Sequence, residues 1–184
     1  MRAFVAIEIP ATVRAQLAGL AGRLRSAGGS VAWVRPENIH LTLRFLGDVA
    51  PEPLERLSSE LAAAYRGRAP FMLAARGTGA FPNPRRPSVL WVGVEPADGP
   101  LAAIQQHAEA AARVIGLPAE TKAFHPHLTL ARVKDWRSAG AVVVRFAEER
   151  SYVAGDFAVG SVSLFSSTLT PRGAVYTRLR EFGF

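Results

Sequence analysis

The chain has 184 residues, no cysteine and a formal charge of +7, from 22 basic and 15 acidic residues. This length suits one domain or two small fused lobes, and the lack of cysteine excludes disulfides, thiolate nucleophiles and cysteine–zinc sites. Hydrophobic residues make up 49% of the chain, enough for a packed core, but no run approaches the roughly 20 apolar residues of a membrane span.

The N-terminal stretch 1–8 is a poor signal peptide, because its apolar run is short and ends at Glu8. We therefore expect a cytoplasmic protein without membrane association, and a monomer. All but two of the basic residues are arginines, whose guanidinium groups bind phosphate oxygens in pairs. The charge thus fits a phosphorylated or nucleic-acid ligand, with genome composition as the alternative explanation.

Strand and helix patterns alternate along the chain, with turn residues between them. The predicted strands are Arg2–Ile9, Val31–Val34, His40–Leu46, Phe71–Phe81, Ser88–Glu95, a strand from His127, Phe157–Leu169 and Ala174–Phe182. The predicted helices are Ala11–Ala27, a helix from Pro51 to Gly67, Asp98–Ile115 and part of Ser138–Glu149. The last two strands are expected to form a hairpin around Thr170–Gly173.

The tetrapeptide His-Leu-Thr-Leu occurs at His40–Leu43 and again at His127–Leu130, 87 positions later. The same offset places the first strand on Trp91–Glu95 and the first helix on the third. We therefore expect an internal duplication within a single bilobal domain of residues 1–184. The predicted class is α+β, with two pseudo-symmetric lobes, each an antiparallel sheet with outer helices, and the active-site cleft between them.

Side chains alternate along a strand, so each repeat turns its histidine and threonine to one face and its two leucines to the core. Facing strands would then place His40, Thr42, His127 and Thr129 around one cleft. A histidine has an ordinary pKa near 6.5, so one imidazole can accept a proton from water while the other donates one to a leaving oxygen. With hydroxyl donors to the phosphate, this set suits a strained cyclic phosphodiester and requires no metal.

Further candidates follow from the same alternation. Arg44 should share the face of His40 and is a candidate phosphate contact, whereas Arg132 falls on the opposite face unless a bulge redirects it. Phe45, Phe124 and Trp91 are candidates for stacking on a base, and core packing is the alternative for each.

The stretch Val34–Gly47 resembles the first signature of the 2H phosphoesterase superfamily, and Phe124–Arg132 resembles the second. Within that superfamily the chain is most similar to the bacterial and archaeal RNA 2′,3′-cyclic phosphodiesterases, also called 2′-5′ RNA ligases. The segments Arg2–Pro10 and Phe81–Val94 carry the same resemblance, which spans essentially the whole chain.

The resemblance implies hydrolysis of an RNA 2′,3′-cyclic phosphate to a terminal 2′-phosphate without a cofactor. It implies that His40 donates the proton to the leaving 3′ oxygen, that His127 activates water, and that Thr42 and Thr129 hold the phosphate. It also gives Arg132 a role in substrate contact, against the alternation argument. Some relatives join tRNA half-molecules without ATP, so RNA ends, tRNA halves among them, are the expected partners.

Two other functions stay open from the sequence. A noncatalytic module could bind RNA ends in the same cleft without turnover. A metallohydrolase could use His40 and His127 as ligands, although two imidazoles without carboxylates make a sparse metal site.

Overall fold

The computed structural model of the chain describes residues 1–171 and 173–184. Within them the helices are α1 (Ala11–Arg25), α2 (Pro51–Tyr65), α3 (Gly99–Val114) and α4 (Gly140–Glu148), with a 3-10 turn η1 (Pro36–Asn38). The strands are β1 (Arg2–Glu8), β2 (Val31–Trp33), β3 (His40–Asp48), β4 (Phe71–Phe81), β5 (Val89–Glu95), β6 (His127–Val133), β7 (Val153–Val159), β8 (Ser161–Thr170) and β9 (Gly173–Gly183). No helix in these residues is long and apolar enough to cross a membrane.

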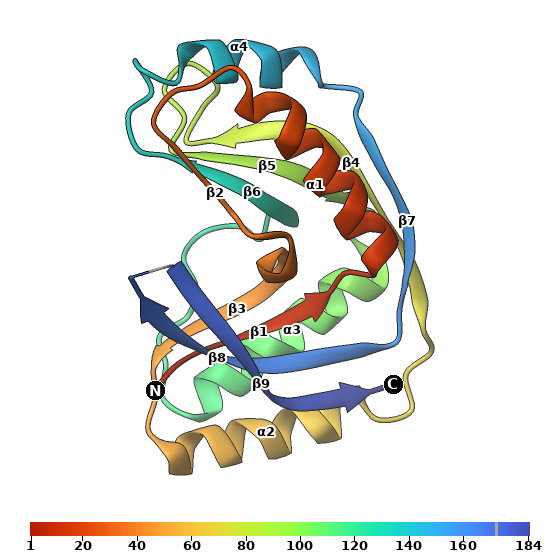
Figure 1. Cartoon of the computed structure of the whole chain (residues 1–184). Helices are drawn as coiled ribbons and strands as arrows, with labels where there is room; N and C mark the ends of the chain where they lie inside the picture. The colour runs from red at the N-terminus through yellow and green to blue at the C-terminus, as the bar shows by residue number, and fades with distance from the viewer. Residues whose placement is uncertain (172) are drawn as a thin grey trace.

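The strands form one antiparallel sheet in the order β7-β4-β5-β6-β3-β1-β8-β9, and β2 pairs with the outer part of β6. We call β7-β4-β5-β6 the β6 half and β3-β1-β8-β9 the β3 half. Figure 1 shows the two halves as the upper and lower arms of a curled sheet, with α4 and α2 outside the arms. The predicted α+β class with pseudo-symmetric antiparallel lobes is confirmed.

The halves exchange their helices. Helix α1 follows β1 but packs on β7 of the opposite half, and α3 follows β5 but packs on α2 and β3. Each helix buries one apolar stripe at helical spacing, which for α1 comprises Val13, Leu17, Leu20, Ala21 and Leu24. One face of the sheet is therefore covered, and polar side chains are left to the other face.

The closing segment differs from the prediction of one long strand over Phe157–Leu169. The chain leaves β7 at Gly160 and begins β8 at Ser161, so that β7 pairs with β4 while β8 pairs with β1 and β9. Apolar residues alternate on both sides of Gly160 because β7 and β8 each bury one face. The pattern therefore does not reveal that the two strands pair with different neighbours in the sheet. The β8–β9 hairpin is confirmed, and Arg172 in its turn lies outside the described residues.

Candidate active site

The two His-Leu-Thr-Leu strands are neighbours at the centre of the sheet. Leu41 pairs with Leu128 in antiparallel register, and both leucines are fully buried. In this register the residue before Leu41 faces the residue after Leu128. His40 therefore comes opposite Thr129, and Thr42 comes opposite His127, all on the face away from the leucines.

A β-bulge follows each repeat and changes which residues reach this face. In β3 the register with β1 skips Leu43, and in β6 the register with β5 skips Leu130. Two consecutive side chains then turn to the covered face, after which the alternation resumes with opposite parity. The bulges lie at equivalent places in the two halves.

Arg44 is consequently absent from the cleft, so its expected place beside His40 and Thr42 was wrong. Its side chain is buried on the helix side, where Nε lies 2.7 Å from Glu109 and Nη1 lies 3.4 Å from Glu120. It also donates to the carbonyl oxygens of Phe45 and Pro118. Arg44 thereby connects β3 to α3 and to the loop after α3. The equivalent residue of the other half is Ala131, which is also buried.

The same bulges bring Phe45 and Arg132 to the cleft face. Phe45 is 60% exposed, and its ring centre lies 5.9 Å from that of Phe4, which stacks on His40. Arg132 is exposed and close enough for its charge to lower the pKa of His127. Strict alternation predicts Arg132 on the opposite face, which is wrong because the bulge at Leu130 reverses the parity of the residues after it. Equivalent positions thus carry an aromatic ring in one half and a cation in the other.

His40 is held by its own strand entry and by aromatic rings. Its Nδ1 donates to the Asn38 carbonyl at 2.7 Å, because a carbonyl oxygen can only accept. The imidazole stacks on Phe4 at 4.7 Å between ring centres and meets the edge of Tyr176 at 5.3 Å. Nε2 is left for the cleft.

The charges around His40 act in opposite directions. Burial lowers the pKa of His40 below its ordinary value, and the nearby His127 lowers it further. The hydrogen bond to Asn38 and the carboxylate of Glu8 act to raise the pKa. Glu8 lies directly opposite His40 in the β1–β3 register.

His127 has the same backbone anchor in a different setting. Its Nδ1 donates to the His125 carbonyl at 2.6 Å, and its ring lies 5.0 Å from Phe81 and 6.0 Å from Trp91. A Cβ on Gly79 would overlap the Trp91 ring, so glycine at this position lets the indole lie directly over β4.

The surroundings of His127 are cationic where those of His40 include a carboxylate. Burial lowers the pKa of His127, the hydrogen bond to His125 raises it, and the charges of His125 and Arg132 lower it. The residue opposite His127 in the β5–β6 register is Gly93, which occupies the place that Glu8 has opposite His40. Ile7 pairs with Leu41 and Val92 pairs with Leu128, so Ile7 and Val92 hold equivalent places in the two halves. They are 85 positions apart, whereas the histidines are 87 apart, so the 87-residue offset expected between β1 and Trp91–Glu95 is wrong by two residues.

Thr42 and Thr129 lie half-buried on the cleft face. Neither hydroxyl has a hydrogen-bond partner within residues 1–171 and 173–184. Two hydroxyls between two imidazoles, all on one face, form a set of donors for a tetrahedral anion.

A pocket of about 340 Å³ opens beside His40, lined by residues of β1, η1, α1, β8 and β9. Glu8 accepts from Arg178 at 2.8 Å and from the Ser163 hydroxyl at 3.3 Å. Sequence reasoning did not select Phe4, Glu8 or Tyr176 as site residues. The parity of Phe4 and Glu8 on the N-terminal strand was the available signal, whereas Tyr176 is brought in only by the pairing of β9 with β8.

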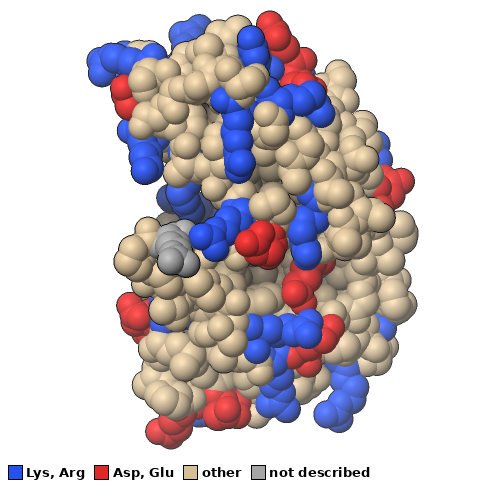
Figure 2. All heavy atoms as spheres, in the orientation of Figure 1, with Lys and Arg blue, Asp and Glu red and all other residues tan. Residues whose placement is uncertain are grey.

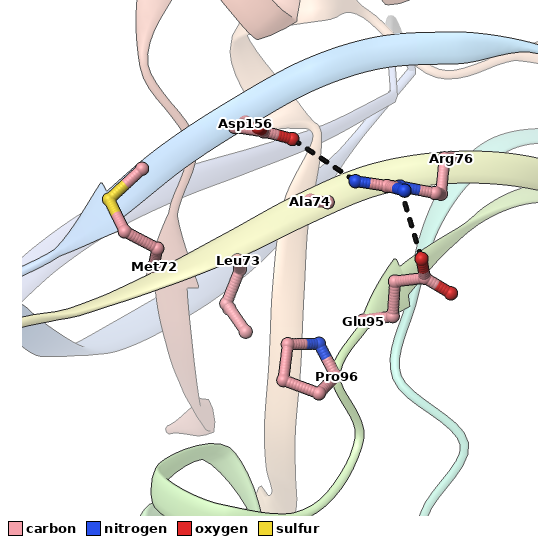
Figure 3. Close-up of a pocket in the computed structure, with 7 residues that line it drawn as sticks. All are labelled: Met72, Leu73, Ala74, Arg76, Glu95, Pro96 and Asp156. Carbon is pink, nitrogen blue, oxygen red and sulfur yellow. Dashed lines mark hydrogen bonds and ion pairs between the residues drawn. The ribbon is translucent and has the colours of Figure 1, made fainter.

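A second pocket, of about 370 Å³, lies between β4, β5 and β7 (Figure 3). Arg76 lies between Glu95 and Asp156 and pairs with both, at 3.1 and 3.3 Å. Its single positive charge faces two carboxylates, so the lining carries a net negative charge, and no histidine lines the pocket. This pocket therefore lacks the imidazole pair that the cleft presents.

Within the described part of the chain, no group of three His, Cys, Asp or Glu side chains comes together to hold a metal ion. His40 and His127 each use Nδ1 for a carbonyl, which leaves one nitrogen per ring. Two free ring nitrogens alone make a sparse ligand set.

Comparison with known proteins agrees with this geometry. A family model described as LigT like Phosphoesterase matches residues 7–91 and again 92–176. The RNA 2′,3′-cyclic phosphodiesterase of Methanothermobacter thermautotrophicus is 35% identical over 182 residues, covering 99% of this chain and 98% of its own. The protein of the same name from Aeropyrum pernix is 39% identical over 166 residues, covering 90% and 93%.

Among solved structures, TT0787 of Thermus thermophilus superposes with a TM-score of 0.83 and 32% identity, covering 100% of this chain and 97% of its own. The match extends along the whole sheet and both repeats. The chain therefore belongs to the LigT-like phosphoesterase family.

Proposed function

We propose that this protein hydrolyses a terminal 2′,3′-cyclic phosphate of RNA to a 2′-phosphomonoester, with two histidines as acid and base and no metal. The observation that carries the proposal is the antiparallel pairing of the two repeats, which puts His40, Thr42, His127 and Thr129 on one face. The printed names of the relatives at 35% and 39% identity support the substrate class.

The tautomers favour this chemistry. Because both Nδ1 atoms donate to carbonyl oxygens, each neutral imidazole carries a free lone pair on Nε2, and each protonated one carries a donor there. One Nε2 can remove a proton from water as the other gives a proton to the leaving oxygen. The two steps need one neutral and one protonated ring.

The surrounding charges support His40 as the proton donor to the leaving 3′ oxygen and His127 as the base. The Glu8 carboxylate favours a proton on His40, whereas His125 and Arg132 disfavour one on His127. Burial lowers the pKa of both rings and acts against a proton on either one. A bound phosphate adds negative charge between them, which raises both pKa values and supplies the protonated acid when substrate is present.

The remaining cleft residues hold the substrate. The hydroxyls of Thr42 and Thr129 donate to the non-bridging phosphate oxygens, where negative charge develops during in-line displacement. Arg132, on the β6 half, contacts the cyclic phosphate or the next phosphate along the RNA. Phe45, exposed on the opposite side, offers a ring on which the terminal base stacks.

The same cleft supports 2′-5′ ligation. A 5′-hydroxyl of a second RNA, such as the second half of a cleaved tRNA, would replace water as the nucleophile, while the leaving oxygen and its acid stay the same. We propose that the protein acts as a monomer on such RNA ends in the cytoplasm.

The deciding experiment is incubation with an oligonucleotide that ends in a 2′,3′-cyclic phosphate, in EDTA, followed by identification of the product. A 2′-phosphate is expected. A 3′-phosphate would mean that the leaving oxygen is assigned wrongly, and tight binding without turnover would identify an RNA-end binding module. Activity that EDTA removes and added metal restores would identify a metallohydrolase.

A further inference from the structure

The β6 half carries a group of cations beyond His127, of which the proposed reaction uses only Arg132. We call Arg86, Lys134, Trp136 and Arg137, with Arg132 at their inner edge, the Trp136 surface. Arg86 and Arg137 lie over the same indole, with their guanidinium carbons 5.5 and 4.9 Å from its centre. Figure 2 shows basic side chains along the upper edge of the opening between the two halves.

The backbone holds this surface in place. The Val133 N–H donates to the Ser88 carbonyl at 2.9 Å, and the Lys134 N–H donates to the Ser30 carbonyl at 2.9 Å. Arg132 pairs with Val89 on one side of β6. The loops that carry Arg86 and Arg137 are thereby attached to the strand that carries His127.

The cations of the surface are uncompensated. Arg86, Arg132, Lys134 and Arg137 are exposed, and none of them forms an ion pair within residues 1–171 and 173–184. The nearby carboxylate of Asp135 instead accepts the backbone N–H groups of Arg137 and Ser138, at 3.1 and 3.3 Å.

Two arginines of the other half, by contrast, are paired with carboxylates. Arg178 pairs with Glu8 and Glu181, and Arg44 pairs with Glu109 and Glu120. Two guanidinium groups beside one indole repel each other, and anionic oxygens bound at this surface would reduce that repulsion. The surface is thus arranged to bind anionic oxygens beside the cleft.

Resting on the proposed function, we infer that the RNA strand upstream of the cyclic phosphate leaves the cleft along β6 and that the Trp136 surface binds its backbone phosphates. The strand rises about 3.3 Å per residue, so the Cα atom of Arg132 lies at most roughly 17 Å from that of His127, while its charge is still close enough to lower the pKa of His127. A single nucleic-acid strand advances about 3.4 Å per nucleotide when stacked and about twice that when extended, so phosphates about three to five nucleotides from the end reach the surface.

The test compares 2′,3′-cyclic AMP with a hexanucleotide ending in a 2′,3′-cyclic phosphate. The variant is Arg86→Gln with Arg137→Gln, and the matched control is Arg56→Gln with Arg66→Gln, two exposed arginines at α2 on the other half. The surface variant is expected to lower kcat/KM for the hexanucleotide about tenfold and to leave that for cyclic AMP unchanged. Two lost phosphate contacts should reduce the slope of log affinity against log salt by roughly 1.4. The control variant should match the wild type with both substrates.

Equal losses with both substrates would overturn the inference, because the two loops would then support the cleft rather than the RNA. No loss with either would overturn it as well. Binding of the fluorescent hexanucleotide, measured by anisotropy at two salt concentrations, tests the surface independently of turnover. A wild-type protein that hydrolyses neither substrate yet binds the hexanucleotide through Arg86 and Arg137 would refute the proposed reaction and support the surface.

Discussion

The β3 half and the β6 half share one backbone plan and differ in charge. In each half the histidine donates a hydrogen bond to the carbonyl of the residue two positions earlier, and a threonine follows the histidine by two positions. Each half also has a β-bulge at the second leucine of the repeat. The β3 half adds Glu8 beside its histidine, whereas the β6 half adds Arg132 and an uncompensated cationic surface. We propose that the symmetric geometry supplies two proton carriers and that the asymmetric charges make one of them the acid and the other the base.

The largest expected effect tests the symmetric part. His40→Ala and His127→Ala should each lower kcat for a cyclic-phosphate oligonucleotide by roughly 10²–10⁴-fold, since each removes one proton-transfer group. The double variant should be little worse than either single one, because the two groups act in one step. His107→Asn, in α3 and away from the cleft, is the control and should retain turnover. Near-normal turnover of either cleft variant would refute two-histidine catalysis.

The second effect concerns a position where the halves differ in the core. Arg44→Ala copies the Ala131 of the other half and leaves Glu109 without its partner at 2.7 Å. Breaking such a buried pair should cost about 3 kcal/mol of the free energy of unfolding, measured by urea denaturation. KM should stay close to the wild-type value, because the side chain lies on the helix side of the sheet. A raised KM with an unchanged free energy of unfolding would show instead that Arg44 contacts the substrate.

Substitution of Thr42 and Thr129 compares how much each half contributes to binding the phosphate. Thr42→Val and Thr129→Val keep the side-chain shape and remove one donor each. Loss of a hydrogen bond to a charged group costs about 1.5–3 kcal/mol, so kcat/KM should fall roughly 10- to 100-fold in each variant. Thr168→Val, at an exposed position of β8, is the control. A loss in only one variant would show that the phosphate is bound by one half.

The smallest effect, a shift in pH dependence, tests the division into acid and base. Glu8 raises the pKa of His40, so Glu8→Gln should lower it. Activity rises with pH as His127 loses its proton and falls as His40 loses its own, so the falling limb of the kcat/KM profile should move to lower pH. NMR titration of the His40 imidazole measures the same change directly.

Glu181→Gln is the matched control for this shift, because Glu181 also pairs with Arg178 but is not among the groups that shift His40. Its pH profile should follow the wild type. Movement of the rising limb in Glu8→Gln, with the falling limb fixed, would exchange the roles of the two histidines.

The cleft residues were predictable because the information is local. The alternation in His-Leu-Thr-Leu separates two polar side chains from two leucines whatever the strand pairs with, and both repeats keep this order in the structure. The strands β1, β3, β4 and β5 and the three long helices were predicted close to their observed bounds for the same reason. Buried apolar residues repeat at the period of the element that they occupy.

The positions of Arg44 and Arg132 were not predictable from alternation. A bulge adds one residue to one strand, and its place depends on how β3 meets β1 and how β6 meets β5. Because Arg44 follows Leu43 in an alternating strand, the pattern predicts that it lies on the polar face. Its burial on the other face is made favourable by Glu109 and Glu120, which come more than 60 residues later in the chain. The change of partner between β7 and β8 was missed for a similar reason.

The sequence by itself determined that two imidazoles and two hydroxyls are presented on strand faces opposite a leucine core, because that depends on neighbours one and two residues away. Only the tertiary structure decided that Glu8 faces His40 while Gly93 faces His127, and that Phe45 and Arg132 complete the cleft. These contacts are set by strand register and bulges, which are fixed by pairing between segments far apart in the chain.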